Sequence, residues 1–245
     1  MSERGRILSG DVLKYFAKRL LINRWYIIVI ILLLSLMSCS FCGYDEFSKL
    51  IIWQFGGFSY DFIVDKDVPL NYLIFVFQLL LILGTGSLTD IKNNNINVMI
   101  RFGRERFWIY RSIIVVIQVA LLIFLIMAAA LLVSVMSGVN IYSAGTAAVL
   151  KGIIINTFPM CVISLQGIMT MQLIINPILA DMFYGAVMIS ILFVAERHML
   201  IDNMFTYRSA LVFDDGIWLS GIRYMFIWIG IVMAGCLIAR RKDLI

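Results

Sequence analysis

The chain alternates between long apolar runs and shorter polar or mixed stretches along most of its length. Six of these runs approach or exceed the roughly 20 residues that an α-helix needs to cross a hydrocarbon core about 30 Å thick. They cover residues 25–42, 70–88, 113–137, 152–175, 178–195 and 224–239. Only helices or closed barrels can span lipid, and the runs are too long and continuous for the roughly ten-residue alternating strands of a barrel. The pattern predicts an all-α integral membrane protein with six transmembrane helices.

The composition also favours a membrane protein. Hydrophobic residues make up 62% of the 245 residues and charged residues only 14%, against roughly 25% charged residues in ordinary globular domains. The mean hydropathy is +0.97. With 17 Phe and 14 Met in addition, the chain has too little polar surface to cover a soluble fold. We therefore expect a multi-pass protein of the cell (plasma) membrane.

Basic residues indicate the orientation in the membrane. They gather in residues 1–24, in the loop 89–112 and in the tail 240–245, which six helices place on one side. By the positive-inside rule that side is the cytoplasm, so both termini are expected there. The stretches 43–69 and 196–223 then become outer loops. Their mixture of aromatic residues, glycine and acids favours short helices at the outer interface.

Residues 1–24 are amphipathic. Leu13, Phe16 and Leu20 share one helical face, and Lys14 and Lys18 share another. This pattern is typical of an interfacial helix that lies in the headgroup plane. We therefore expect a cytoplasmic N-terminal elbow helix before the first span.

The cytoplasmic loop contains the stretch "NNNINVMIRFG", which predicts a short helix of its own. Asparagines up to Asn95 can cap the start of a helix, and Gly103 suits the left-handed turn after one. Ile96, Met99 and Ile100 fall at i, i+3 and i+4, so they form one apolar face. That face could dock into a groove of a soluble partner, or it could lie on the membrane. The spacing leaves both interpretations open.

The arginines that follow have a simpler role as topology signals that hold the loop inside. Anionic lipid attracts each basic residue near its surface by about 1 kcal/mol. This attraction would account for Arg106 and Arg111 beside the third span.

The sequence offers little material for catalysis. There is one histidine, His198, so no site with several histidines can hold a metal ion. Asp181 is the only acid within the six apolar runs, whereas ion-coupled carriers bury charges along their path. The phosphate-binding motif G-x-x-x-x-G-K-S/T is absent. We therefore expect no catalytic, metal or cofactor-binding residue, and neither an enzyme nor an ion-coupled carrier.

Asp181 lies near the start of the fifth run, after Asn176 and Pro177 in the tight connection "NPILAD". A helix-start acid that complements the helix dipole is the first interpretation. A contact of Asn176 and Asp181 with a cytoplasmic partner is the alternative.

Small residues in the spans have structural interpretations. Cys39 and Cys42 form a C-x-x-C at the end of the first run, typical of two small core residues, with a disulfide as the alternative. Gly230 and Gly235 in the sixth run are expected to permit close helix packing.

The order of these parts resembles the permease subunits of ABC-2-type transporters. An amphipathic N-terminal helix precedes two spans and a basic cytoplasmic loop, a short link joins the fourth and fifth spans, and the chain ends in "RRKDLI". The stretch "TDIKNNNINVMIRFGRERFWIYRS" is similar to the family's loop with an acid, a coupling helix and arginines that open the third span. The resemblance assigns ATPase coupling to Asp90, Asn95, Ile96, Met99, Ile100, Arg101, Phe102, Arg104, Glu105 and Arg106.

The resemblance implies a half-transporter without its own energy source. Two such chains, or this chain and a relative, would form a pore with separate ABC ATPase subunits that hold ATP and Mg. In its small size and lack of a large outer domain, the chain is similar to a bacterial subgroup of this family. Members of that subgroup export bacteriocins and other amphipathic peptides, or confer immunity to them. An amphipathic peptide or lipid-like cargo is therefore expected, and no nucleic acid partner. The alternative function is a scaffold or immunity protein that binds a partner or toxin through its outer loops and transports nothing.

Overall fold

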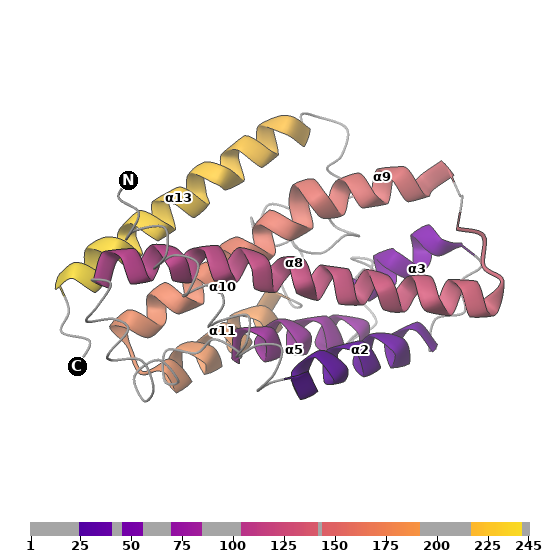
Figure 1. Cartoon of the computed structure of the whole chain (residues 1–245), viewed down its shortest axis with the longest axis horizontal. Helices are drawn as coiled ribbons and strands as arrows, with labels where there is room; N and C mark the ends of the chain where they lie inside the picture. Colours follow the sequence, from indigo (N-terminus) through magenta and orange to yellow (C-terminus); the bar gives the residue numbers. More distant parts are fainter. Residues whose placement is uncertain are drawn as a thin grey trace, which may run out of the picture.

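A computed structural model describes residues 25–40, 46–55, 70–84, 104–141, 144–191 and 217–241 of the chain. Within these ranges the fold is all-helical, and an isolated bridge between Glu46 and Asn140 is its only extended pairing. The helices (Figure 1) are α2 (Trp25–Ser40), α3 (Phe47–Gln54), α5 (Leu70–Gly84), α8 (Arg104–Ser137), α9 (Ala144–Gly152), η2 (Ile153–Thr157), α10 (Phe158–Ile174), α11 (Pro177–Ile191) and α13 (Ile217–Arg241). The N-terminal segment 1–24 lies outside the described residues, so its elbow helix stays a prediction.

Three of the described helical stretches are long and apolar enough to cross a membrane. They are Glu105–Ser137, Gly145–Ile174 and Gly221–Arg241. The second is one uninterrupted run of α9, η2 and α10, in which η2 is a π-helical segment. The shorter apolar helices are Trp25–Ser40, Leu70–Ile82 and Pro177–Met188. The prediction of an all-α membrane protein is therefore confirmed in this coarser form, while the number of six spans stays a prediction.

Helix α8 starts well before the predicted third span. The stretch 104–112, expected to be loop, forms its first turns. The physical reason is that Phe107, Trp108 and Ser112 are buried, so packing extends the helix through charged sequence. Arg111 is buried as well, with 1% of its surface exposed. Its expected contact with lipid headgroups is therefore wrong.

Helix α13 also begins early, at Ile217, inside the predicted outer loop 196–223. Arg223, the last residue of that predicted loop, is exposed on the side of this helix. A long charged side chain on an outer helical face can reach water or headgroups, so it does not end the helix.

The stretch 43–69, predicted as an outer loop with short helices, contains the short helix α3, but this helix is packed into the bundle. Gln54 at its end donates hydrogen bonds to the Ser35 carbonyl and the Cys39 sulfur of α2. Trp53 Nε1 donates to the Ser38 carbonyl at 3.2 Å. Helix α3 therefore folds back along α2. Cys39 is buried in this contact, and Cys42 lies outside the described residues.

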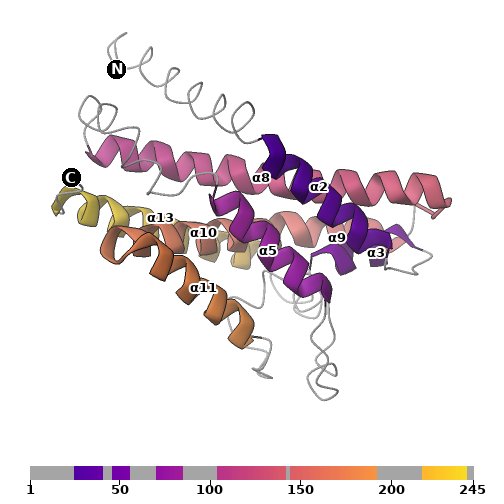
Figure 2. The same cartoon turned by 90° about the horizontal axis from the view of Figure 1, so that it is seen from below.

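Helix α5 lies between α2 and α11 (Figure 2) and forms hydrogen bonds with several neighbouring helices, including α3, where Asn71 Nδ2 donates to the Trp53 carbonyl at 3.0 Å. Gln78 Nε2 donates to the Ser35 hydroxyl of α2 at 2.9 Å. The Tyr72 hydroxyl donates to the Met188 carbonyl of α11 at 2.6 Å. From α8, Gln118 Nε2 donates to an α5 carbonyl at 3.4 Å. These polar contacts fix how α2, α8 and α11 are turned toward α5.

Helices α8 and α13 approach closely at Trp108 and Gly235. The Trp108 indole is buried, and its Nε1 donates to the Val232 carbonyl at 3.2 Å. A Cβ atom on Gly235 would overlap the indole ring. Gly235 therefore has the packing role expected from the sequence, whereas no atom lies within 4 Å of a Cβ placed on Gly230.

The substitution Gly235→Ala should destabilise the protein, because its methyl group and the Trp108 indole cannot occupy the same space. We expect a loss of about 1–3 kcal/mol, typical of overpacking, seen as a lower midpoint of thermal unfolding in detergent. Gly230→Ala is the matched control on the same helix, and it should be neutral or slightly stabilising because alanine has the higher helix propensity. Equal midpoints for Gly235→Ala and the unchanged protein would contradict the close contact.

Candidate functional site

The candidate site is one end of the helical bundle. The N-terminal end of α8, the connection between α10 and α11, and the C-terminal end of α13 all lie there (Figure 1). A contact confirms part of this arrangement, since Arg240 Nε of α13 lies 3.4 Å from Glu105 Oε1 of α8. Four of the predicted site residues with described side chains, namely Glu105, Arg106, Asn176 and Asp181, belong to these elements.

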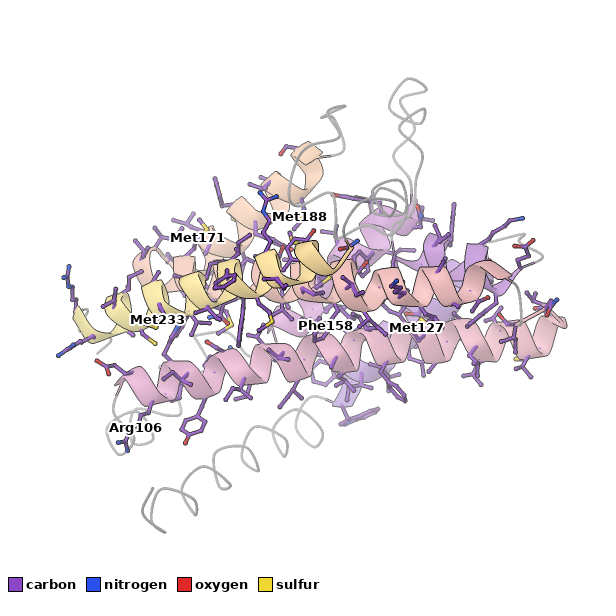
Figure 3. All side chains as sticks on the ribbon, turned by 90° about the horizontal axis from the view of Figure 1, so that it is seen from above. Arg106, Met127, Phe158, Met171, Met188 and Met233 are labelled. Carbon is purple, nitrogen blue, oxygen red and sulfur yellow. The ribbon has the colours of Figure 1, made fainter. Side chains whose placement is uncertain are left out.

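The α8 part of the site is charged and accessible. Glu105 and Arg106 are both exposed, and Figure 3 shows Arg106 near the first turns of α8. The side chains of Arg240 and Glu105 are 74% and 54% exposed, so their ion pair contributes only about 0–1 kcal/mol. A pair this weak can open for a partner at little cost. These charges can therefore contact another protein or lipid headgroups without unfolding either helix.

The α10–α11 part is a tight, hydrogen-bonded connection. Helix α10 ends at Ile174 and α11 begins at Pro177, a residue favoured at the first helical position. The Asn176 side chain accepts a hydrogen bond from the Ile178 N–H at 3.0 Å. Asn176 is therefore a helix cap, which satisfies an N–H that the helix itself leaves without a partner.

Asp181 ties α11 back to α10. Gln172 Nε2 of α10 donates to Asp181 Oδ1 at 2.7 Å. Asp181 lies beyond the first turn of α11, which contains no acid, and the effect of a helix dipole falls off within that turn. The structure therefore shows Asp181 as a hydrogen-bond acceptor for Gln172 and not as an acid that interacts with the helix dipole.

Much of the predicted coupling segment lies outside the described residues. This applies to Asp90, Asn95, Ile96, Met99, Ile100, Arg101 and Phe102. Arg104 is the first residue of α8, and its side chain is not among those described. The structure joins Glu105 to Arg240, and it joins Asp181 to Gln172, as two separate contacts at the same end. The assignment of these residues to coupling stays a prediction.

Sequence reasoning missed two residues that shape this end. Gln172 was read as part of an apolar run, and Trp108 as part of a loop. A signal for Gln172 exists, because two helices joined by a two-residue link place residues near the link opposite each other. For Trp108 the sequence offers no comparable signal; in the structure its backbone carbonyl accepts a hydrogen bond from the Ser112 hydroxyl at 3.1 Å.

In the part of the chain that the structure describes, no group of three or more His, Cys, Asp or Glu side chains could hold a metal ion. Comparisons with protein-family models, with curated proteins and with solved structures gave no match.

Replacing Asp181 should test the link between α10 and α11. Asp181→Ala leaves the buried Gln172 amide without this acceptor, which costs about 1–3 kcal/mol and lowers the thermal midpoint in detergent. Asp181→Asn is the matched control, because its side-chain oxygen can still accept the bond, and it should retain most of the stability. If Asp181→Ala unfolded at the same temperature as the unchanged protein, the hydrogen bond would not stabilise the connection.

Proposed function

We propose that this chain is the membrane-spanning permease subunit of an ATP-driven exporter of the ABC-2 type, coupled to a separate ATPase subunit. The observation that carries the proposal is the accessible, charged end of the bundle at which α8 begins. The segment with the apolar face of Ile96, Met99 and Ile100 directly precedes this helix in the sequence. A partner that grips the segment would therefore act on the start of α8.

Helix α8 is well suited to carry such a movement through the membrane. It has 34 residues, which at 1.5 Å per residue gives a length of about 50 Å. Its packing partners include α2, α5, α10 and α13. A displacement at its charged end would therefore reach most of the bundle, as a permease driven by an external ATPase requires.

The proposal includes six spans with both termini in the cytoplasm. The shorter helices α2, α5 and α11 each expose large apolar side chains, among them Leu33, Phe77 and Met182, which are 53%, 51% and 66% exposed. Such surfaces belong in lipid rather than in water. With these helices as additional spans, the basic segments fall on one side of the membrane, in agreement with the positive-inside rule.

The cargo that suits this chain is an amphipathic peptide or a lipid-like molecule. Few charged side chains lie in the predicted spans, and ions would need such charges along their path. Completion of the pore requires a second permease chain, either another copy or a close relative. ATP and Mg are held by the partner ATPase.

Purification of the tagged chain from its native cells in mild detergent is the direct test of this function. We expect a protein with a Walker motif to co-elute at comparable stoichiometry, as identified by mass analysis. A preparation without any nucleotide-binding protein, even in the presence of a non-hydrolysable ATP analogue, would refute the permease function. The scaffold or immunity function would then be favoured.

The apolar face of the coupling segment should be required for ATPase stimulation. Met99→Asp or Ile100→Asp places a charge on the docking face, and we expect either change to abolish coupled ATPase activity of the purified complex. Membrane insertion should be unchanged, because the segment lies outside the spans. Val98→Asp is the matched control, since it adds the same charge on the opposite side of the predicted helix. Activity that survives both docking-face changes would contradict the docking assignment.

A further inference from the structure

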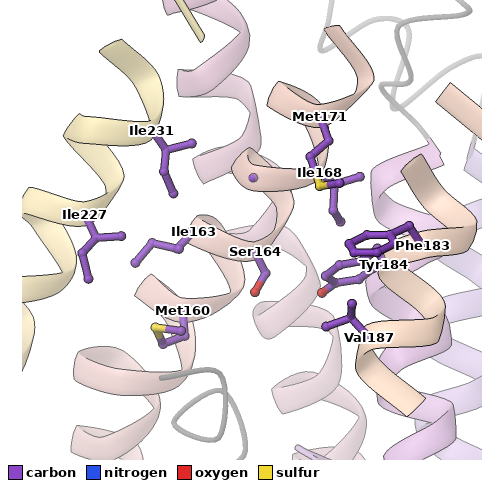
Figure 4. Close-up of a pocket in the computed structure, with 11 residues that line it drawn as sticks. Met160, Ile163, Ser164, Ile168, Met171, Phe183, Tyr184, Val187, Ile227 and Ile231 are labelled. Carbon is purple, nitrogen blue, oxygen red and sulfur yellow. The ribbon is translucent and has the colours of Figure 1, made fainter. Parts of the chain in front are cut away.

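A partly open apolar pocket lies between three helices. Its volume is about 460 Å³. Helix α10 forms the floor, α11 one wall and α13 the other (Figure 4). The lining residues used below are Ser164, Gly167, Phe183, Tyr184, Ile227 and Ile231.

The pocket exists because α11 and α13 both pack on α10 but are not closely packed on each other. Gly167 on the floor adds to the space, since no atom lies within 4 Å of a Cβ placed there. Phe183 stands at one side of the pocket with 55% of its surface exposed. The pocket is thus a crevice that opens sideways from the bundle.

The two helices that form the walls carry exposed large apolar side chains, as a surface in contact with lipid does. On α11, Met182 and Phe183 are 66% and 55% exposed, and on α13 Met225 and Phe226 are 63% and 71% exposed. Helix α13 and the run containing α10 are both long and apolar enough to span a membrane. The crevice therefore opens toward hydrocarbon, and lipid chains are the molecules present there.

The polar groups of the pocket are few and face each other. The Tyr184 hydroxyl lies opposite the Ser164 hydroxyl (Figure 4). Tyr184 is buried, with 7% of its surface exposed. Charged side chains are absent from the described lining. An occupant without charge is favoured, because an ion buried here would have no partner of opposite sign.

We propose that this crevice is a binding site for one hydrocarbon chain of a membrane phospholipid. Its volume is about three times that of the roughly 150 Å³ apolar cavity that holds a benzene molecule. By that measure it accommodates about 18 carbon atoms, the size of one fatty-acyl chain. Enclosed apolar cavities take up apolar molecules, and for a crevice that opens to lipid the apolar molecules at hand are acyl chains. The inference goes beyond the proposed permease function and does not require an ATPase partner.

The test uses phosphatidylethanolamine with a photoreactive diazirine in one acyl chain, added to the full chain in phosphatidylethanolamine–phosphatidylglycerol vesicles. Gly167→Leu fills the floor of the crevice from a position where added atoms meet open space. We expect adducts on the α10 lining to fall by about tenfold, which corresponds to about 1.4 kcal/mol of binding free energy. Ile231→Phe fills the crevice from the α13 wall and should act in the same direction.

Gly185→Leu is the matched control. It makes the same change on α11 at a position outside the lining, where no atom lies within 4 Å of an added Cβ. Labelling of α10 should be unchanged in this variant, and gel filtration should show all three variants as folded proteins. Equal labelling in the filled variants and the control would overturn the proposal, and so would adducts confined to the outer residues Met182 and Phe226.

A second copy of the chain is the competing occupant. A photoreactive amino acid in place of Ile227 would join two copies if another chain filled the crevice, and that product would also overturn the proposal. Labelling requires no nucleotide. If the chain purifies without an ATPase, the permease function is refuted. If Gly167→Leu still reduces the adducts on α10 in that case, the lipid site is established independently of the permease function.

Discussion

Water does not reach the hydrocarbon core of a bilayer, so a polar side chain between membrane helices must find its partner within the protein. Around α5, side-chain donors find acceptors on neighbouring helices of the described bundle. Gln78 bonds to α2, Tyr72 bonds to α11, and Gln118 of α8 bonds to the α5 backbone. Each such bond contributes only about 0.6 kcal/mol on average in membrane proteins. These hydrogen bonds are important because they are directional. They fix the rotation of each neighbouring helix about its own axis, whereas apolar contacts alone would allow several rotations.

The same contrast between directional and apolar contacts describes the two regions proposed to act. At the charged end, the hydrogen bond from Gln172 to Asp181 ties α11 to α10, and the exposed ion pair of Glu105 with Arg240 adds a weaker contact between α8 and α13. The crevice instead lies between α11 and α13, which are not closely packed on each other, and its walls are mainly aliphatic and aromatic. We propose that the charged end is where a soluble partner binds and that the crevice is where lipid binds.

The sequence predicted the class of fold because apolar run length is a physical requirement for crossing lipid. It did not predict where helices begin. Charges at Arg104 and Arg111 suggested a loop, but packing of Trp108 continues the helix through them. The tight link at Asn176 was visible in the order of residues, whereas the bond from Gln172 to Asp181 depends on how two helices face each other. The two-residue link indicates that residues near it on α10 and α11 lie opposite each other, but it does not specify which two side chains meet.

The π-helical segment η2 has a consequence for the geometry of α9. A π-helical turn contains about one residue more than an α-helical turn. Because each residue of an α-helix rotates the chain by about 100° around the helix axis, this extra residue changes the direction in which the following side chains point. Helix α9 therefore presents a different side to the bundle than it would as a plain extension of α10. On the side that it does present, a Cβ built on Gly145 lies 3.6 Å from the Ser48 hydroxyl oxygen of α3. The π-helical segment η2 thus determines which side of α9 faces α3.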